Sequence, residues 1–100
     1  MSEEKVYQGW RSPDGQEAYV TVNGEPLRHI VFVSPTGMEW GYMGAAPTDL
    51  ALSILTDHLG DEKKAQKLHR EFKEVFVATW GARWRVTGKE ISGWVREQIL

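Results

Sequence analysis

The sequence predicts one α+β domain over residues 1–100, with an antiparallel sheet of three or four strands followed by three helices packed on one face. Two observations carry this prediction. The first half of the chain alternates short β-branched and aromatic runs with turn residues, and the second half repeats apolar residues at helical spacing. One hundred residues, 41% of them apolar and 26% charged, suffice for one core. Residues 1–4 are expected to form a loose tail.

Three strands are expected first, over residues 6–11, 18–22 and 27–33. The stretch Ser12-Pro13-Asp14-Gly15 has the composition of a turn and ends the first of them. Asn23-Gly24 supplies the positive φ angles that a two-residue hairpin turn needs. Turns this short join antiparallel neighbours, because parallel neighbours need long crossovers.

A fourth short strand is predicted over residues 38–43, where Met38, Trp40 and Tyr42 alternate with other residues at a period of two. This alternation favours packing of the three side chains against the helices. The alternative is an exposed aromatic platform for a ligand or a partner. If the three side chains pack against the helices, Glu39 lies on the opposite face, where it could pair with a basic residue such as Arg11 or Arg28.

The first two helices have clear boundaries. Pro47 suits the first turn of a helix, and Gly60 suits a left-handed stop after the apolar stripe ends. Asp61 can cap the second helix, which is expected to continue to Gly81.

Residues 84–86 are short and are interpreted as a candidate edge strand. Thr87 and Glu90 form a capping-box pattern at the start of a third helix. Its apolar face comprises Ile91, Trp94, Val95 and Ile99. The predicted core of the domain comprises Val20, Val22, Ile30, Phe32, Leu50, Ile54, Leu55, Leu68, Phe72, Val75, Ile91 and Val95.

Composition excludes several classes of chemistry. The chain has no cysteine, which removes disulfides, thiolate nucleophiles and cysteine-based zinc sites. His29, His58 and His69 lack the spacing of metal ligands, and Ser34 has no G-x-S-x-G context. The sequence therefore predicts a protein that is not an enzyme and that holds no cofactor or metal. No apolar run is long enough to span a membrane and no signal peptide is evident, so a cytoplasmic protein is expected.

Binding to another protein is the favoured function. Five tryptophans are more large aromatics than a core of this size obviously needs, and exposed rings are good anchors for a partner. The expected contact residues are Glu39, Trp40 and Tyr42, with Trp10 and Arg11 alongside. An edge strand there could also pair with a second copy and give a homodimer.

Nucleic-acid binding is the alternative. It would use a basic second helix and the segment Arg83-Trp84-Arg85, in which Trp84 could stack on a base. The basic residues of that helix are Lys63, Lys64, Lys67, Arg70 and Lys73. A net charge of −2 and the glutamates at 62, 71 and 74 oppose this alternative, since ion pairs within the helix account for the lysines and arginine.

Residues 34–55, with the sequence SPTGMEWGYMGAAPTDLALSIL, resemble a family of small bacterial and phage proteins catalogued as a domain of unknown function. Its members carry a block close to SPTGFEWGYGGSGP followed by LALxIL. Further similarity occurs at Tyr7-Gln8-Gly9, Phe72-Lys73 and 84–87. Here Met38 replaces a phenylalanine, and Ala45-Ala46 replaces Ser-Gly. The resemblance implies a bacterial or phage origin and brings no established activity, cofactor or functional residue.

Overall fold

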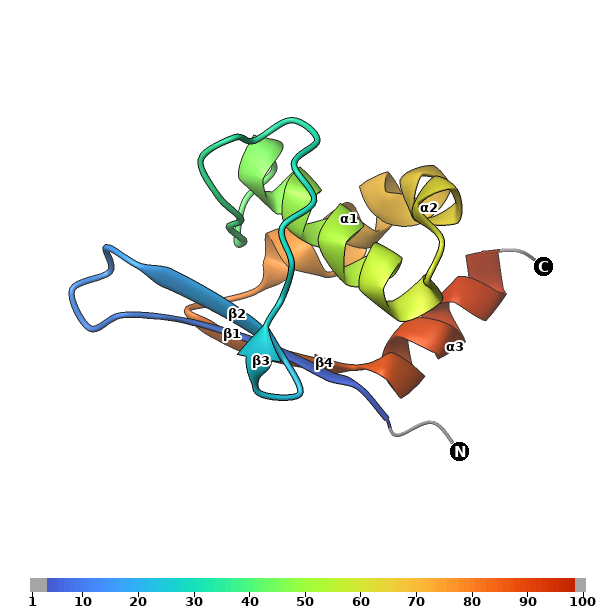
Figure 1. Cartoon of the computed structure of the whole chain (residues 1–100), viewed down its shortest axis with the longest axis horizontal. Helices are drawn as coiled ribbons and strands as arrows, with labels where there is room; N and C mark the ends of the chain where they lie inside the picture. Colours follow the sequence, from blue (N-terminus) through green and yellow to red (C-terminus); the bar gives the residue numbers. More distant parts are fainter. Residues whose placement is uncertain (1–3, 99–100) are drawn as a thin grey trace.

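A four-stranded antiparallel sheet, in the order β3-β2-β1-β4, has two helices over one face, and the last helix continues beyond the end of β4 (Figure 1). The computed structural model describes residues 4–98. The elements are β1 (Val6–Arg11), β2 (Ala18–Val22), β3 (Glu25–Pro26), α1 (Ala45–Leu59), α2 (Glu62–Val75), a 3-10 turn η1 (Val77–Thr79), β4 (Arg83–Thr87) and α3 (Gly88–Gln98). The predicted α+β class and antiparallel sheet are confirmed. Of the expected loose tail, residues 1–3 lie outside the described range, and Glu4 is exposed.

β1 is a central strand, and its side chains alternate between the two faces of the sheet. Tyr7 lies opposite Val22 of β2 and Val86 of β4, and its buried hydroxyl donates to a carboxylate oxygen of Asp57 in α1 at 2.7 Å. This bond ties the sheet to the helical layer. The predicted hairpin turn is present between β2 and β3, since Asn23 has a φ of 49° and Gly24 a φ of 83°.

The third strand predicted over residues 27–33 is wrong, because β3 comprises only Glu25–Pro26. The Leu27 N–H still donates to the Val20 carbonyl of β2 at 3.0 Å, and the chain leaves the sheet after it. The reason lies in where the backbone donors go. The N–H of Ile30 donates to the Ser53 hydroxyl, and those of residues 32–34 donate to the Asp49 carboxylate. Both acceptors are on α1, so this segment follows the helix and leaves the sheet.

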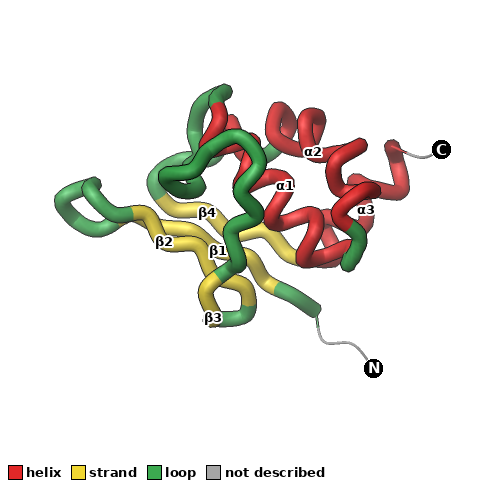
Figure 2. Tube along the Cα trace, turned by 45° about the horizontal axis from the view of Figure 1, so that its top comes forward, coloured by secondary structure: helices red, strands yellow, loops and turns green. Residues whose placement is uncertain are grey.

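The fourth strand predicted over residues 38–43 is also wrong, because these residues form an irregular loop. The fourth strand of the sheet is β4, at the place where the sequence suggested an edge strand. β4 lies between α2 and α3 in the chain, so the sheet does not wholly precede the helices (Figure 2). Trp40 nevertheless is 1% exposed and belongs to the core, as the favoured interpretation expected.

The helix ends follow the predicted chemistry. Gly60 ends α1 with a φ of 69°, and Asp61 accepts the Lys64 N–H at the start of α2. The Glu90 side chain accepts the Thr87 N–H at 2.9 Å while the Thr87 hydroxyl accepts the Glu90 N–H at 3.1 Å, which confirms the capping box. α2 ends at Val75, earlier than predicted, because η1 follows.

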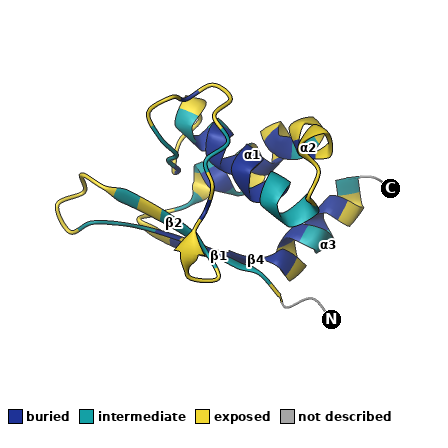
Figure 3. Cartoon of the chain, viewed as in Figure 1, coloured by how far each residue is buried: buried dark blue, intermediate teal, exposed yellow. Residues whose placement is uncertain are grey.

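Most of the predicted core is buried or partly buried around α1 (Figure 3). Two members are wrong: Phe32 is 49% exposed and Val75 is 53% exposed. Phe32 faces outward because its backbone N–H faces α1. At the end of α2 the chain turns, and Val77 of η1 takes the buried position in place of Val75. Ile99 lies outside the described residues.

Candidate functional site

A buried carboxylate organises the segment between β3 and α1. The side chain of Asp49, in the first half of α1, is fully buried. It accepts the N–H groups of Phe32 at 3.1 Å, Val33 at 2.9 Å and Ser34 at 3.1 Å, and its Oδ2 lies 2.8 Å from His29 Nε2. Four donors therefore converge on one carboxylate and hold the segment against α1.

Hydrogen bonding decides the charge of this group. Burial alone would raise the pKa of Asp49, but the bonds from His29 and from the backbone amides of residues 32–34 outweigh burial and hold the pKa below its ordinary value. Asp49 is therefore an anion at neutral pH. Its bonds to backbone donors are charge-assisted, which makes them stronger than neutral ones.

Three adjacent apolar side chains of this segment are exposed. Val31 is 61% exposed, and Phe32 and Val33 are each 49% exposed. We call Val31–Val33 the apolar segment. Adjacent apolar side chains on a soluble surface are unusual and mark interaction sites more often than isolated ones do. The backbone behind Phe32 and Val33 is bonded to Asp49.

A cavity of about 350 Å³ lies beside the apolar segment. Its lining comprises Phe32, Val33, Thr48, His69, Arg70, Lys73 and Glu74. The ring of Phe32 meets the edge of the buried His69 ring at a centroid distance of 5.6 Å. Lys73 donates to the Thr48 hydroxyl at 3.0 Å, which ties α2 to the start of α1. The cavity thus combines an apolar wall with a predominantly basic rim.

The family model described as "Family of unknown function (DUF6166)" matches residues 7–97. The chain belongs to this family. A comparison with curated proteins and one with solved structures gave no match. The block that carried the resemblance, residues 34–55, begins directly after the apolar segment in this DUF6166 chain. It extends through most of α1 and contains Asp49.

Three of the predicted partner-binding residues form one cluster, in which Trp40 is buried and Arg11 and Glu39 are partly exposed. The Arg11 guanidinium lies 4.4 Å from the centre of the Trp40 ring, pairs with the Glu39 carboxylate and donates to the Trp40 carbonyl at 3.2 Å. Trp40 Nε1 donates to the Gly81 carbonyl at 2.7 Å. Of the two basic residues suggested for Glu39, Arg11 and Arg28, it is Arg11 that forms the ion pair. Trp40 itself is buried, so it is not an anchor for a partner.

The other two predicted partner residues lie apart from this cluster. Tyr42 is 50% exposed, so the favoured interpretation, which packed it against the helices, is wrong for this residue. It is correct for the buried Trp40. Trp10 precedes Arg11 in β1 and therefore points to the opposite face of the sheet. The five residues predicted to form one surface are thus divided among three places.

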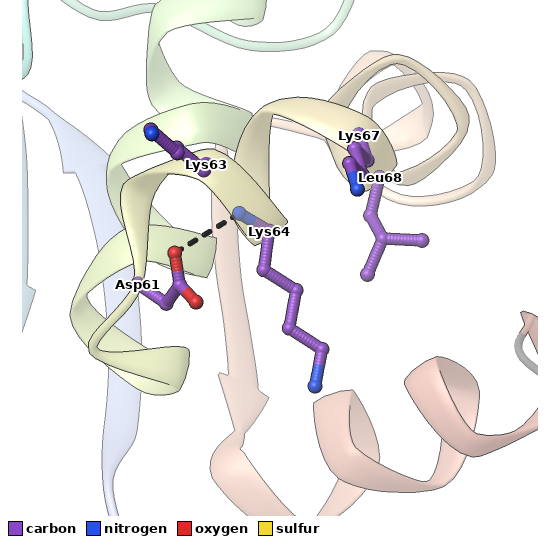
Figure 4. A pocket seen from close by; sticks show the side chains of 5 residues that line it. All are labelled: Asp61, Lys63, Lys64, Lys67 and Leu68. Atoms are coloured by element: carbon purple, nitrogen blue, oxygen red, sulfur yellow. Dashed lines mark hydrogen bonds between the residues drawn. The ribbon is translucent and has the colours of Figure 1, made fainter.

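The basic residues of α2 are divided between two pockets, since Arg70 and Lys73 line the cavity beside the apolar segment. Lys63, Lys64, Lys67 and Leu68 line a pocket of about 400 Å³ with Asp61, yet the three lysine side chains extend in different directions (Figure 4). Asp61 is engaged as the helix cap. The interpretation of α2 as a continuous phosphate-binding face, with Arg70 beyond these lysines, gains no support from this geometry.

Trp84 cannot stack on a base as the alternative required. Its side chain is 5% exposed, lies on the helix side of the sheet and stacks on Trp80 at a centroid distance of 3.9 Å. Gly9 lies directly beneath it, since a Cβ there would come within 2.2 Å of the Trp84 indole. Its neighbours Arg83 and Arg85 are exposed on the other face.

The histidines and Ser34 have structural partners. His58 Nε2 lies 2.7 Å from the Ser92 hydroxyl, and His69 Nδ1 donates to the Gln66 carbonyl at 2.7 Å. The Ser34 hydroxyl donates to the Gly37 carbonyl, and not to His29. Within residues 4–98, no three histidine or acidic side chains are grouped so that they could hold a metal ion. In the same range, no helix is long and apolar enough to cross a membrane.

His58 gives a pH-dependent stability that can be measured. Burial, and then the nearby Lys5 ammonium, lower the pKa of His58, against the opposing effect of Asp57. The unfolded chain then binds a proton at a higher pH than the folded chain does. Stability is therefore complete above about pH 6.5 and falls as the pH drops below it.

Urea denaturation midpoints at about pH 7 and about pH 5 should show this loss in wild type. In His58→Gln, which cannot titrate, the difference between the two midpoints should shrink. An unchanged difference in the variant would contradict the assignment to His58.

Sequence reasoning missed Asp49, Ser53 and the apolar segment. A signal was present, because Asp49 and Ser53 are four residues apart beside the apolar stripe of Leu50 and Ile54. Polar side chains beside the buried stripe of a helix need partners, and unpaired backbone donors of a neighbouring segment are suitable ones. Which segment supplies them is set by tertiary structure.

Proposed function

We propose that this DUF6166 chain is a non-enzymatic protein-binding module that contacts its partner through the apolar segment. The observation that carries the proposal is the exposure of three adjacent apolar side chains on a backbone fixed by a buried carboxylate. Exposed apolar area provides binding energy, and a fixed backbone reduces the entropy lost on association. The titratable side chains behind the segment are engaged in structural bonds, which supports a binding role over catalysis.

The cavity beside the segment indicates the chemistry of the partner. Arg70 and Lys73 bring two positive charges to its rim against the single negative charge of Glu74. A partner segment that presents a large apolar side chain to Phe32 and Val33, with a carboxylate beside it, fits this surface. We therefore propose an acidic, apolar peptide segment of another protein as the occupant.

A random-peptide display screen on the immobilised protein tests this proposal. Enriched peptides should combine a large apolar residue with aspartate or glutamate. Phe32→Ser should weaken the binding of an enriched peptide by about tenfold or more, the loss expected of a half-exposed aromatic anchor. Tyr42→Ser is the matched control because Tyr42 is 50% exposed and Phe32 is 49% exposed.

Both side chains are half-exposed, so both variants should keep the wild-type circular dichroism spectrum. A peptide that loses affinity with Tyr42→Ser and keeps it with Phe32→Ser would move the contact to the loop at residues 38–43. Failure to enrich any peptide over an unrelated protein would contradict the proposal. Bacterial or phage origin and a cytoplasmic location stay predictions from the sequence.

A further inference from the structure

The sheet has a face that the helices do not cover (Figures 1 and 2). Tyr7, Gly9 and Trp84 point to the helical layer, so alternation along the strands places their neighbours on the other side. We call this side the open face. Its central residues are Gln8 and Trp10 of β1, Tyr19 and Thr21 of β2, and Arg83 and Arg85 of β4.

The strand register arranges these residues in two rows across the sheet. In one row Trp10 lies between Tyr19 and Arg83; in the other, Gln8 lies between Thr21 and Arg85. Neighbouring strands are about 4.8 Å apart, so each row spans about 10 Å. A row of that length is suited to contact about two stacked nucleotides.

The first row contains an aromatic platform. The rings of Trp10 and Tyr19 stack with centroids 5.7 Å apart and an angle of 27° between their planes. Tyr19 is 41% exposed, and its hydroxyl donates to Glu17 at 3.0 Å. Ring faces of this kind accept nucleobases of any sequence, because every base has a π-face.

The open face is positive along β4 and negative at the far end of β2, where the Glu17 and Asp14 carboxylates raise the pKa of Tyr19. The chain has fourteen acidic residues, yet β1, β2 and β4 contain none. Of the arginines in these strands, Arg11 is paired with Glu39 on the helix side. Arg83 and Arg85 are exposed, and neither has an ion-pair partner among residues 4–98. Glu17 is held at the Tyr19 end of its row, away from these two arginines across β1.

We propose that the open face binds single-stranded nucleic acid, with bases stacked on Trp10 and Tyr19 and phosphates paired with Arg83 and Arg85. Gln8 and Thr21 supply polar groups for the sugar and base edges between them. A duplex hides the faces of its bases, so a single strand is the occupant that uses the aromatic platform. This surface includes no residue of the apolar segment and does not depend on it.

The test is fluorescence anisotropy with labelled oligo-dT and oligo-U of about 12 nucleotides, within the range of site sizes known for small single-strand binders. Titrations at about 50 mM and about 200 mM salt measure the contribution of phosphate contacts. Trp10→Ala should weaken binding by about tenfold, and Trp10→Phe should retain most of it. Arg83→Ala combined with Arg85→Ala should weaken binding and lower the salt slope by about 2.

The matched control is Lys63→Ala combined with Lys67→Ala, which also removes two positive charges, both from α2 and neither from the cavity beside the apolar segment. It should leave the affinity within a factor of about two of wild type, because screening limits distant charges. Stronger binding of oligo-U would assign RNA, and stronger binding of oligo-dT would assign DNA. Equal binding of the two would assign single strands of either kind. The proposal is overturned if neither oligonucleotide binds at low salt. It is also overturned if the control variant loses as much affinity as the arginine variant, or if a duplex binds as tightly as a single strand. None of these outcomes alters the peptide result expected for Phe32.

Discussion

Replacement of Asp49 by asparagine is expected to lower the free energy of unfolding by about 3 kcal/mol, because a charged acceptor serving four donors becomes a neutral amide with one acceptor oxygen. The new NH₂ group would also face N–H groups that it cannot bond. Urea denaturation followed by tryptophan fluorescence measures the change. A loss below about 1 kcal/mol, the value of an ordinary hydrogen bond, would show that Asp49 does not organise the segment.

Asp61→Asn is the matched control, since Asp61 is exposed and bonds only one backbone N–H in its cap. Asparagine is also a good helix cap, so this variant should stay within about 0.5 kcal/mol of wild type. Acid provides a second test of Asp49. Its depressed pKa contributes stability above about pH 4, the value in the unfolded chain, and that contribution is lost as pH falls through the folded pKa. Asp49→Asn should lose less stability than wild type does on acidification below about pH 4.

Gly9→Ala is expected to destabilise the fold by about 3 kcal/mol through overpacking. A Cβ at this position would lie 2.2 Å from Nε1 and 2.3 Å from Cε2 of Trp84. The indole has no room to retreat, because its ring stacks on Trp80 at 3.9 Å and meets Trp40 edge-on at 5.7 Å. The same denaturation experiment measures the loss, and the tryptophan emission should shift as the stack is disturbed.

Gly93→Ala is the control for the general effect of adding a methyl group to a glycine. Gly93 lies inside α3, and a Cβ at this position would meet no atom of another element within 4 Å, so alanine there should stabilise the helix by up to about 1 kcal/mol. If Gly9→Ala proved as stable as wild type, the close approach of Trp84 to β1 would not be a constraint on the fold.

Local signals predicted the elements whose boundaries are set by local chemistry. The Asn23-Gly24 turn, the Gly60 stop and the Thr87–Glu90 capping box occur where the sequence indicated them. Each involves bonds or dihedral angles within a few residues, so no distant partner is needed to determine it. β1 and β2 followed for the same reason, since a short turn with strong turn residues joins them.

The candidate site could be predicted only in part. The pairing of Arg11 with Glu39 was anticipated, and Trp40 was expected in the core. Tyr42, two residues further on, is exposed in an irregular loop. The alternating pattern of residues 38–43 cannot by itself distinguish such a loop from a strand. The outward position of Trp10 and the inward position of Trp84 depend on which face of the sheet the helices cover.

The sequence by itself determined the α+β class, the helices, the first hairpin and the caps, because periodicity and capping are local properties. Only the tertiary structure decided that residues 27–33 would leave the sheet. A β-branched, apolar run satisfies its backbone donors equally well from a strand or from side chains on a helix. The carboxylate of Asp49, seventeen residues beyond Phe32, supplied the acceptors. No pattern in the sequence near Phe32 indicates that its backbone N–H bonds a helix side chain and not a strand. The bonds from residues 32–34 to that carboxylate hold the backbone against α1, and the side chains of Val31–Val33 are exposed.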